Sequence, residues 1–256
     1  MQTVTLGRTG LRVSRLGIGT GTNGWNHESD QTRLGFQECA DLVRFAYDQG
    51  IRFWDTADMY GSHDNLGEAF KTIDRTTVVI STKSTSATAE GMKADLDRFR
   101  RELKTDELDI VLLHCMTQVN WPERYAGPME VLSEAKAAGI VKAVGVSCHD
   151  FGAFQTAAET EWVEVVLSRI NHSQLHMDAT PAEVIRVMSR MHSSGKGVYG
   201  MKVMGAGDLK DDPEKAIRFV MGLDCVDAHI VGMTSRDQIL QNVRLTEQFE
   251  REPALV

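Results

Sequence analysis

One pattern constrains the fold of this chain more than any other: short runs rich in β-branched residues alternate with longer amphipathic segments. The alternation recurs eight times in 256 residues, at an average spacing of about 32. The predicted strands cover residues 15–21, 52–57, 77–83, 108–115, 141–147, 163–171, 197–204 and 227–233. The predicted helices cover residues 37–49, 63–73, 89–103, 125–138, 151–159, 181–193, 213–221 and 235–249. Eight consecutive strand–helix units favour an α/β fold of the closed (β/α)8 TIM barrel type.

An open, doubly wound sheet is the main alternative to the barrel. Its usual Gly-x-Gly-x-x-Gly turn is absent, because the first predicted strand ends Gly17-Ile-Gly19-Thr-Gly21 and continues into a long polar loop. Uninterrupted apolar runs such as Ile110-Val-Leu-Leu113 are typical of parallel strands that are buried on both faces. Such runs suit either parallel fold, so the eight repeated units and the missing turn are what favour the barrel.

The first residues predict a small addition to the barrel. Residues 3–6 and 11–14 flank the turn Gly7-Arg-Thr-Gly10, a pattern typical of a β-hairpin, and we expect this hairpin to close the bottom of the barrel. The chain holds only five prolines, and no Pro-rich or Ser-rich linker divides it. We therefore expect residues 1–256 to form a single domain.

Composition excludes several kinds of partner. The chain has 28 basic and 36 acidic residues, a formal net charge of −8, and no block of like charges, which argues against nucleic acid or an anionic membrane as a partner. There is no apolar run of about 18 residues and no secretory signal pattern, so we expect a cytoplasmic protein. Cys39, Cys115, Cys148 and Cys225 are widely separated and predict reduced thiols.

Four polar residues follow or end successive predicted strands. Asp55 closes the second strand, Tyr60 lies in the loop after it, Lys83 closes the third strand and His114 closes the fourth. Barrel enzymes build their active sites at these strand ends, and neighbouring strands lie about 4.8 Å apart. We therefore expect the four side chains to converge at the barrel mouth, although each one alone also has an ordinary structural interpretation.

Together, these residue types suit the reduction of a carbonyl group. Lys83 ends an apolar run and needs a partner, which Asp55 supplies, and a lysine near a phenol would lower the pKa of Tyr60. Tyr60 would then donate a proton while a neutral His114 hydrogen-bonds the substrate oxygen. None of the four can provide a hydride, so this interpretation requires a nicotinamide cofactor.

The sequence resembles the aldo-keto reductase superfamily over nearly its whole length. Residues 50–61, which read Gly-Ile-Arg-Phe-Trp-Asp-Thr-Ala-Asp-Met-Tyr-Gly, resemble its signature, and Ile80-Ser-Thr-Lys83 and Leu112-Leu-His114 resemble two of its strands. The resemblance implies that Asp55, Tyr60, Lys83 and His114 form the family's catalytic tetrad, acting on a small carbonyl substrate. It also implies NADPH as the cofactor, with NADH as the alternative.

Residues 6–17, 144–149 and 197–205 resemble a bacterial branch of this family that often carries an iron–sulfur tail. No cysteine cluster follows the eighth predicted helix, so we expect no iron–sulfur cluster. On the cofactor side, Cys148 and Leu167 replace the asparagine and glutamine that usually hold the nicotinamide amide. The cofactor-binding residues that we predict are Thr20, Gly21, Asp55, Ser147, Cys148, Lys202, Gly205, Gly232, Thr234, Gln238 and Asn242.

Lys202 would contact a phosphate of the cofactor, and the residues from Gly232 to Asn242 would bind its adenosine end. In that stretch only Arg236 offers a positive charge for a 2′-phosphate, so the preference for NADPH comes mainly from the resemblance. We also expect Trp25, Met59, Trp121 and Tyr125 to line an apolar pocket for the substrate; they are equally compatible with loop packing.

Two other classes of function stay open. A metal-dependent hydrolase would use the pairs His114-Cys115 and Cys148-His149 as zinc ligands, although adjacent residues of a strand point to opposite faces. A regulatory barrel that binds a nucleotide with little turnover would explain the reduced amide contacts. We predict no metal ion and no obligate protein partner, and a monomer.

Overall fold

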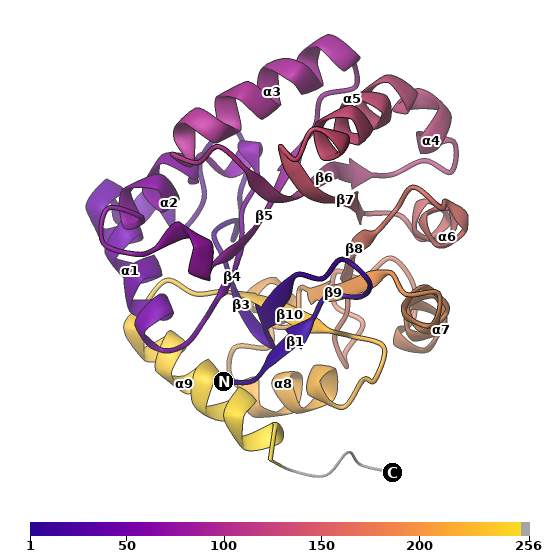
Figure 1. Ribbon diagram of the computed structural model, residues 1–256. Helices are drawn as coiled ribbons and strands as arrows, with labels where there is room; N and C mark the ends of the chain where they lie inside the picture. Colours follow the sequence, from indigo (N-terminus) through magenta and orange to yellow (C-terminus); the bar gives the residue numbers. More distant parts are fainter. Residues whose placement is uncertain (252–256) are drawn as a thin grey trace.

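The computed structural model describes residues 1–251 of the chain. Eight parallel strands close into a barrel in the order β10-β3-β4-β5-β6-β7-β8-β9, as Figure 1 shows. These strands are β3 (Leu16–Gly19), β4 (Phe53–Asp55), β5 (Val79–Ser84), β6 (Leu108–Met116), β7 (Val141–Cys148), β8 (Val165–Arg169), β9 (Gly197–Met201) and β10 (Ala228–Gly232). The predicted (β/α)8 barrel is confirmed.

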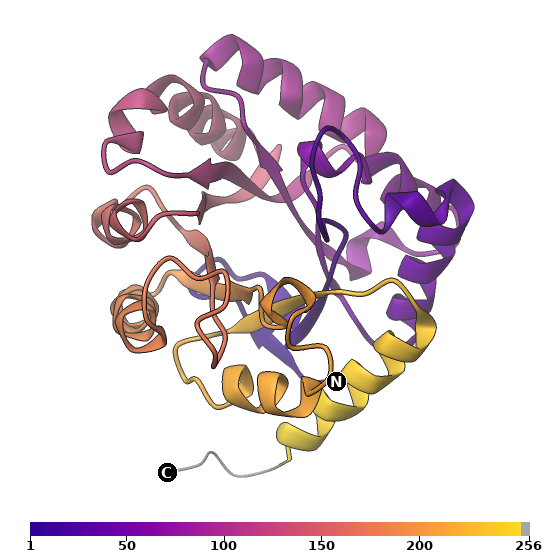
Figure 2. The same ribbon diagram turned by 180° about the vertical axis from the view of Figure 1, so that it is seen from behind.

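Helices surround the barrel in Figures 1 and 2, and each barrel strand is followed by at least one of them. The α-helices are α1 (Phe36–Asp48), α2 (His63–Ala69), α3 (Ala89–Glu102), α4 (Trp121–Arg124), α5 (Ala126–Ala137), α6 (Phe151–Glu159), α7 (Pro181–Ser193), α8 (Pro213–Met221) and α9 (Arg236–Phe249). Short 3-10 helices are η1 (Thr32–Leu34), η2 (Asp58–Tyr60), η3 (Arg75–Thr77) and η4 (Gly205–Gly207). Within residues 1–251, no helix is both long and apolar enough to span a membrane.

The predicted hairpin is also confirmed. Strands β1 (Thr3–Thr5) and β2 (Arg12–Ser14) pair antiparallel and lie across the end of the barrel that faces the viewer in Figure 1. Leu6 and Val13 are fully buried and pack with the side chains that fill the barrel interior. The hairpin therefore closes this end, and the strands open toward the other end, seen in Figure 2.

Five barrel strands (β3, β4, β8, β9 and β10) end one to three residues earlier than the sequence predicts, and for β8 and β9 the structure shows the cause. β9 stops at Met201 rather than at residue 204, because Lys202 has a left-handed backbone with φ of 59°. β8 stops at Arg169 rather than at residue 171, because the buried side chain of Asn171 hydrogen-bonds four backbone groups and turns the chain. Helix α2 likewise ends at Ala69 rather than at residue 73, and α4 was not predicted.

Strand alternation decides which side chains face the interior. Phe53, Ile110, Leu112, Leu167 and Tyr199 belong to one interior cluster. Their neighbours at odd spacing, such as Trp54, Val111 and Val166, pack in the layer between the strands and the helices. Side chains two residues beyond the interior set therefore reach the open end of the barrel.

Candidate active site

The structure brings Asp55, Tyr60, Lys83 and His114 together at the open end of the barrel. Lys83 Nζ lies 2.7 Å from Asp55 Oδ2 and 2.7 Å from the carbonyl oxygen of Thr56. Tyr60 Oη lies 3.4 Å from His114 Nε2, and Lys83 Nζ lies 5.3 Å from the centre of the Tyr60 ring. The phenol and the imidazole thus face the same space above an ion pair.

Burial determines the charges of these groups. It raises the pKa of Asp55 and lowers that of Lys83, and their direct contact opposes both changes. Burial and the charge of Lys83 lower the pKa of His114 well below its usual value, so the imidazole is neutral at pH 7. His114 Nδ1 is buried and has no hydrogen-bond partner among residues 1–251.

Tyr60 differs from the sequence prediction. We expected Lys83 to lower the pKa of this phenol, but burial and the negative charge of Asp55 raise it well above 10. The reason is that the Lys83 ammonium is already paired with Asp55 and the Thr56 carbonyl. Tyr60 therefore keeps its proton at neutral pH, which is the form that a proton donor needs.

Tyr199 holds the Asp55 carboxylate, and Ser81 in turn holds the Tyr199 hydroxyl; the sequence did not indicate either residue. The hydroxyl of Tyr199 donates to Asp55 Oδ1 at 3.1 Å and lies 2.8 Å from Ser81 Oγ. The ring packs against Phe53 inside the barrel, with a distance of 5.0 Å between ring centres. The only signal in the sequence is a tyrosine at an inward position of a predicted strand.

The loop after β3 supports Tyr60. A Cβ atom at Gly21 would lie 2.2 Å from Tyr60 Cε2, and one at Gly24 would lie 2.4 Å from Tyr60 Cδ1. The two glycines therefore let the backbone pack directly on the phenol ring. Thr20 is buried and donates to the backbone oxygen of Asp55 at 3.1 Å, so this residue fixes the end of β4. Thr20 and Gly21, predicted as cofactor residues, contact the tetrad.

The two predicted cofactor residues of β7, Ser147 and Cys148, point to opposite faces of the barrel wall. Ser147 is buried at an inward position and accepts a hydrogen bond of 3.0 Å from the backbone N–H of Cys115. Cys148 packs in the layer between strands and helices, because the next residue of a strand points to the other face. The structure does not bring Cys148 to the barrel mouth, which contradicts the prediction of Cys148 as a cofactor residue.

The remaining predicted cofactor residues follow β9 and β10. Gly205 has φ of 54° in the turn after β9. Gln238 Oε1 accepts a hydrogen bond of 2.8 Å from the backbone N–H of Thr234 at the start of α9, close to the exposed Gly232. Asn242 is 5% exposed, and its side-chain amide has no hydrogen-bond partner among residues 1–251. The amide atoms are not among the fully buried unpartnered atoms of residues 1–251, so they reach solvent and are open to a ligand.

The two His-Cys pairs do not converge as a metal site would require. Cys115 Sγ lies 3.7 Å from both ring nitrogens of His149, whereas Cys148 faces the helix layer. His149 Nδ1 is engaged with Arg169 at 2.6 Å. Within residues 1–251, no three His, Cys, Asp or Glu side chains are arranged to hold a metal ion.

The residues predicted to line the substrate pocket do not all lie at the barrel mouth. Trp25 is 64% exposed in the loop after β3. Trp121 is fully buried and donates to the backbone oxygen of Ala153 at 3.2 Å, and Tyr125 packs against the same helix layer. The prediction was wrong for Trp121 and Tyr125, because the short helix α4 turns both toward the helices.

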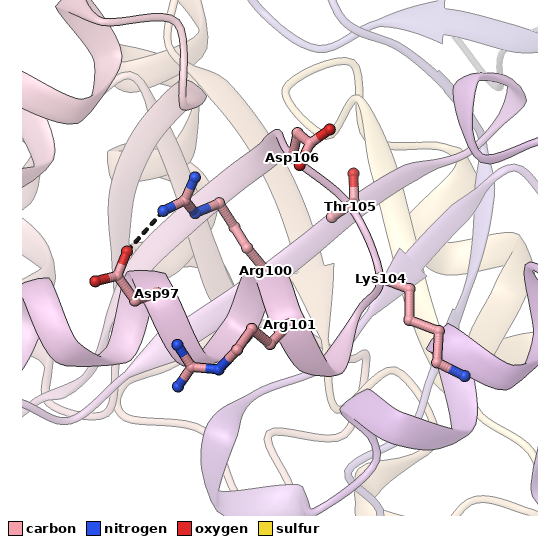
Figure 3. A pocket seen from close by; sticks show the side chains of 6 residues that line it. All are labelled: Asp97, Arg100, Arg101, Lys104, Thr105 and Asp106. Atoms are coloured by element: carbon pink, nitrogen blue, oxygen red, sulfur yellow. Dashed lines mark hydrogen bonds and ion pairs between the residues drawn. The ribbon is translucent and has the colours of Figure 1, made fainter.

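A surface hollow of about 370 Å³ lies far from the tetrad. It is formed at the end of α3 and the turn before β6, which is the end of the barrel opposite the mouth. Figure 3 shows its charged side chains, of which Arg100 pairs with Asp97. The lining residues are Asp97, Arg100, Arg101, Lys104, Thr105 and Asp106. No predicted site residue contributes to it.

Comparison with known proteins identifies the family. The family model described as the aldo/keto reductase family matches residues 15–215. The chain belongs to the aldo/keto reductase family. This confirms the resemblance drawn from the motifs, and it places the chain in a family of oxidoreductases that use nicotinamide cofactors.

Several curated aldo-keto reductases are similar in sequence. Aldo-keto reductase YhdN of Bacillus subtilis is 29% identical over 167 residues, which cover 57% of this chain and 47% of YhdN. The NADH-specific methylglyoxal reductase of Escherichia coli is 26% identical over 174 residues, which cover 57% of this chain and 52% of that protein. The chain thus spans about half the length of these two relatives. D-threo-aldose 1-dehydrogenase of a Pseudomonas species is 22% identical over 247 residues, or 83% of this chain and 73% of that one.

Solved structures share the fold. The aldo-keto reductase PA4992 of Pseudomonas aeruginosa superposes with a TM-score of 0.81 at 24% identity, covering 97% of this chain and 96% of that one. The holo form of AKR11C1 from Bacillus halodurans superposes with a TM-score of 0.79 at 19% identity, covering 100% and 93% of the two chains. At these identities, the similarity supports the barrel architecture.

Proposed function

We propose that this protein reduces an aldehyde or ketone to an alcohol with NAD(P)H. One observation carries the proposal: a protonated Tyr60 and a neutral His114 face one space, 3.4 Å apart, above the buried Lys83–Asp55 pair. A bound nicotinamide would supply the hydride that none of these side chains can provide.

The chain's own residues would handle the oxygen of the substrate. His114 Nε2 and Tyr60 Oη can both hydrogen-bond a carbonyl oxygen placed between them. As the carbonyl carbon gains the hydride, the oxygen takes the proton of Tyr60, and the phenolate left behind regains a proton from solvent. Lys83, 5.3 Å from the ring centre and paired with Asp55, offsets part of the repulsion between Asp55 and that transient negative charge.

The residues around the mouth fit a dinucleotide. Ser147 would face the nicotinamide, Gly205 would lie near the diphosphate, and Gly232, Thr234, Gln238 and the unpartnered Asn242 would bind the adenosine end.

A hollow of about 180 Å³ beside Thr234 bears on the choice between NADPH and NADH. It combines the positive charge of Arg236 with the carboxylates of Glu38 and Asp41. Because these carboxylates repel a 2′-phosphate, we expect NADH and NADPH to bind with similar affinity.

A titration with NADPH and NADH, followed by turnover of a panel of aldehydes and ketones, tests this function. We expect Tyr60→Phe to lower kcat by at least about 1000-fold while the nucleotide Kd stays within about twofold, because only the proton donor is lost. Tyr47→Phe removes a surface hydroxyl whose one hydrogen bond within residues 1–251 is to Thr77; it is the matched control and should keep full activity.

Other outcomes would assign the protein differently. A wild-type rate for Tyr60→Phe would refute the role of Tyr60. Tight nucleotide binding without turnover of any carbonyl compound would indicate a regulatory barrel, for which the loss of amide contacts at Cys148 and Leu167 is the supporting feature.

A further inference from the structure

Two positive side chains lie at the barrel mouth and have no part in the chemistry described above. Arg169 is the last residue of β8, and Lys202 directly follows Met201, the last residue of β9. Arg169 and Met201 are partners across the two neighbouring strands. Arg169 follows the interior residues Val165 and Leu167 at a spacing of two, so its side chain starts inward at the open end.

The guanidinium of Arg169 is held in place from two sides. It donates to Asp178 Oδ1 at 2.9 Å and contacts His149 Nδ1 at 2.6 Å. Its Nε is buried and has no hydrogen-bond partner among residues 1–251. Burial and the positive charges of Arg169 and Lys202 lower the pKa of His149 to about 3, so His149 is a neutral acceptor. The guanidinium is therefore pre-positioned.

The ammonium of Lys202 has no counter-charge of its own. Within residues 1–251, no hydrogen bond or ion pair engages its Nζ, although the side chain is half-buried. Burial and the like charge of Arg169 lower its pKa. Asp178, the carboxylate that pairs with Arg169, can neutralise only one of the two cations. Lys202 is therefore left without a counter-charge, which is unfavourable for a half-buried ammonium unless an anionic ligand supplies one.

The pair lies beside the tetrad. The His149 ring, which Arg169 contacts, is edge-on to the His114 ring with 6.3 Å between the ring centres. Cys115, the residue after His114, places its Sγ 3.7 Å from His149. The positive charges of Arg169 and Lys202 both act on His149, so both lie on the side of the mouth next to His114. A substrate whose carbonyl oxygen sits between Tyr60 and His114 would direct an acid group toward them.

We propose that Arg169 and Lys202 bind a carboxylate of the substrate, so that the enzyme prefers carbonyl compounds that carry an acid group. The inference rests on the proposed reductase function and specifies its substrate class. The other source of the same chemistry is the diphosphate of the cofactor, to which the sequence analysis assigned Lys202. The contact of Arg169 with His149, next to His114, favours the substrate.

The test compares an acid with its neutral ester. We would measure kcat/KM for 4-carboxybenzaldehyde and for methyl 4-formylbenzoate, which differ by one methyl group and one charge. We expect the wild type to favour the acid by about 10-fold or more, since a charge-assisted contact contributes about that much. Lys202→Met should lower kcat/KM for the acid about 10-fold more than it lowers kcat/KM for the ester. Lys210→Met, which removes an exposed lysine nearby, should leave the acid-to-ester ratio unchanged.

Three results would overturn the proposal. Equal kcat/KM for acid and ester in the wild type would contradict it directly. A Lys202→Met variant that loses acid and ester activity equally, with a weaker Kd for NADPH by fluorescence titration, would assign the cation to the cofactor diphosphate. Failure of 4-methylbenzoate to bind the wild type in calorimetry would also contradict it. A different outcome is a wild type that turns over no carbonyl compound but binds 4-methylbenzoate, with binding lost in Lys202→Met. That outcome would support the anion site and refute only the reductase function.

Discussion

The carboxylate of Asp55 is the best-anchored group of the candidate site. Its Oδ2 accepts from Lys83 at 2.7 Å, and its Oδ1 accepts from Tyr199 at 3.1 Å. A buried carboxylate that lost one of these donors would be left with an unsatisfied oxygen. Tyr199 therefore orients Asp55, and through Asp55 it orients Lys83, without touching the reacting groups.

Tyr199→Phe tests this positioning role. The variant keeps the ring that packs on Phe53 but removes the donor to Asp55, so the pKa of Asp55 rises. We expect kcat to fall about 10-fold with KM nearly unchanged, and the acidic limb of the kcat–pH profile to move to higher pH, because Asp55 is neutralised sooner. Nucleotide binding, measured by fluorescence, should stay the same. A lower melting temperature with an unshifted pH profile would mean that Tyr199 only fills space.

At the scale of secondary-structure elements, the sequence predicted the barrel because each unit carries its own periodicity. The four tetrad residues were found because strand ends meet at one end of a barrel, wherever the strands begin. Tyr199 could not be found this way, because Asp55 and Tyr199 are 144 positions apart and no local pattern tells which inward side chains touch. The ends of β8 and β9 were missed because Asn171 and Lys202 stop them through tertiary contacts and a left-handed turn.

The loop after β3 and the helix η2 meet at Gly21 and the Tyr60 ring. Gly21→Ala would place a methyl group 2.2 Å from Tyr60 Cε2, so the ring must move. We expect kcat to fall at least about 10-fold, since small displacements of a catalytic group are costly, while the circular dichroism spectrum is unchanged. Gly127→Ala in α5, where the new Cβ would meet its neighbours at an ordinary 3.4 Å, is the matched control. Full activity of Gly21→Ala would show that Tyr60 does not depend on this contact.

At the scale of the whole molecule, two apolar layers share one set of strands. An interior cluster is closed from below by Leu6 and Val13 of the hairpin region, and a larger layer lies between the strands and the helices. Polar groups trapped in these layers couple stability to pH. The clearest case is His229 of β10, which is 1% exposed and whose Nε2 has no hydrogen-bond partner among residues 1–251.

Burial and the charge of Arg15 lower the pKa of His229 to about 3 in the folded protein, whereas an unfolded histidine titrates near 6.5. Below about pH 6.5, His229 is protonated in the unfolded state but stays neutral in the folded state. The free energy of unfolding therefore falls as the pH decreases. From about pH 7 to about pH 4.5, the free energy of unfolding measured in urea should fall less in His229→Gln than in the wild type. The difference between the two decreases should be on the order of 2 kcal/mol. All other groups titrate alike in the two proteins, so equal losses would show that His229 is protonated in the folded state.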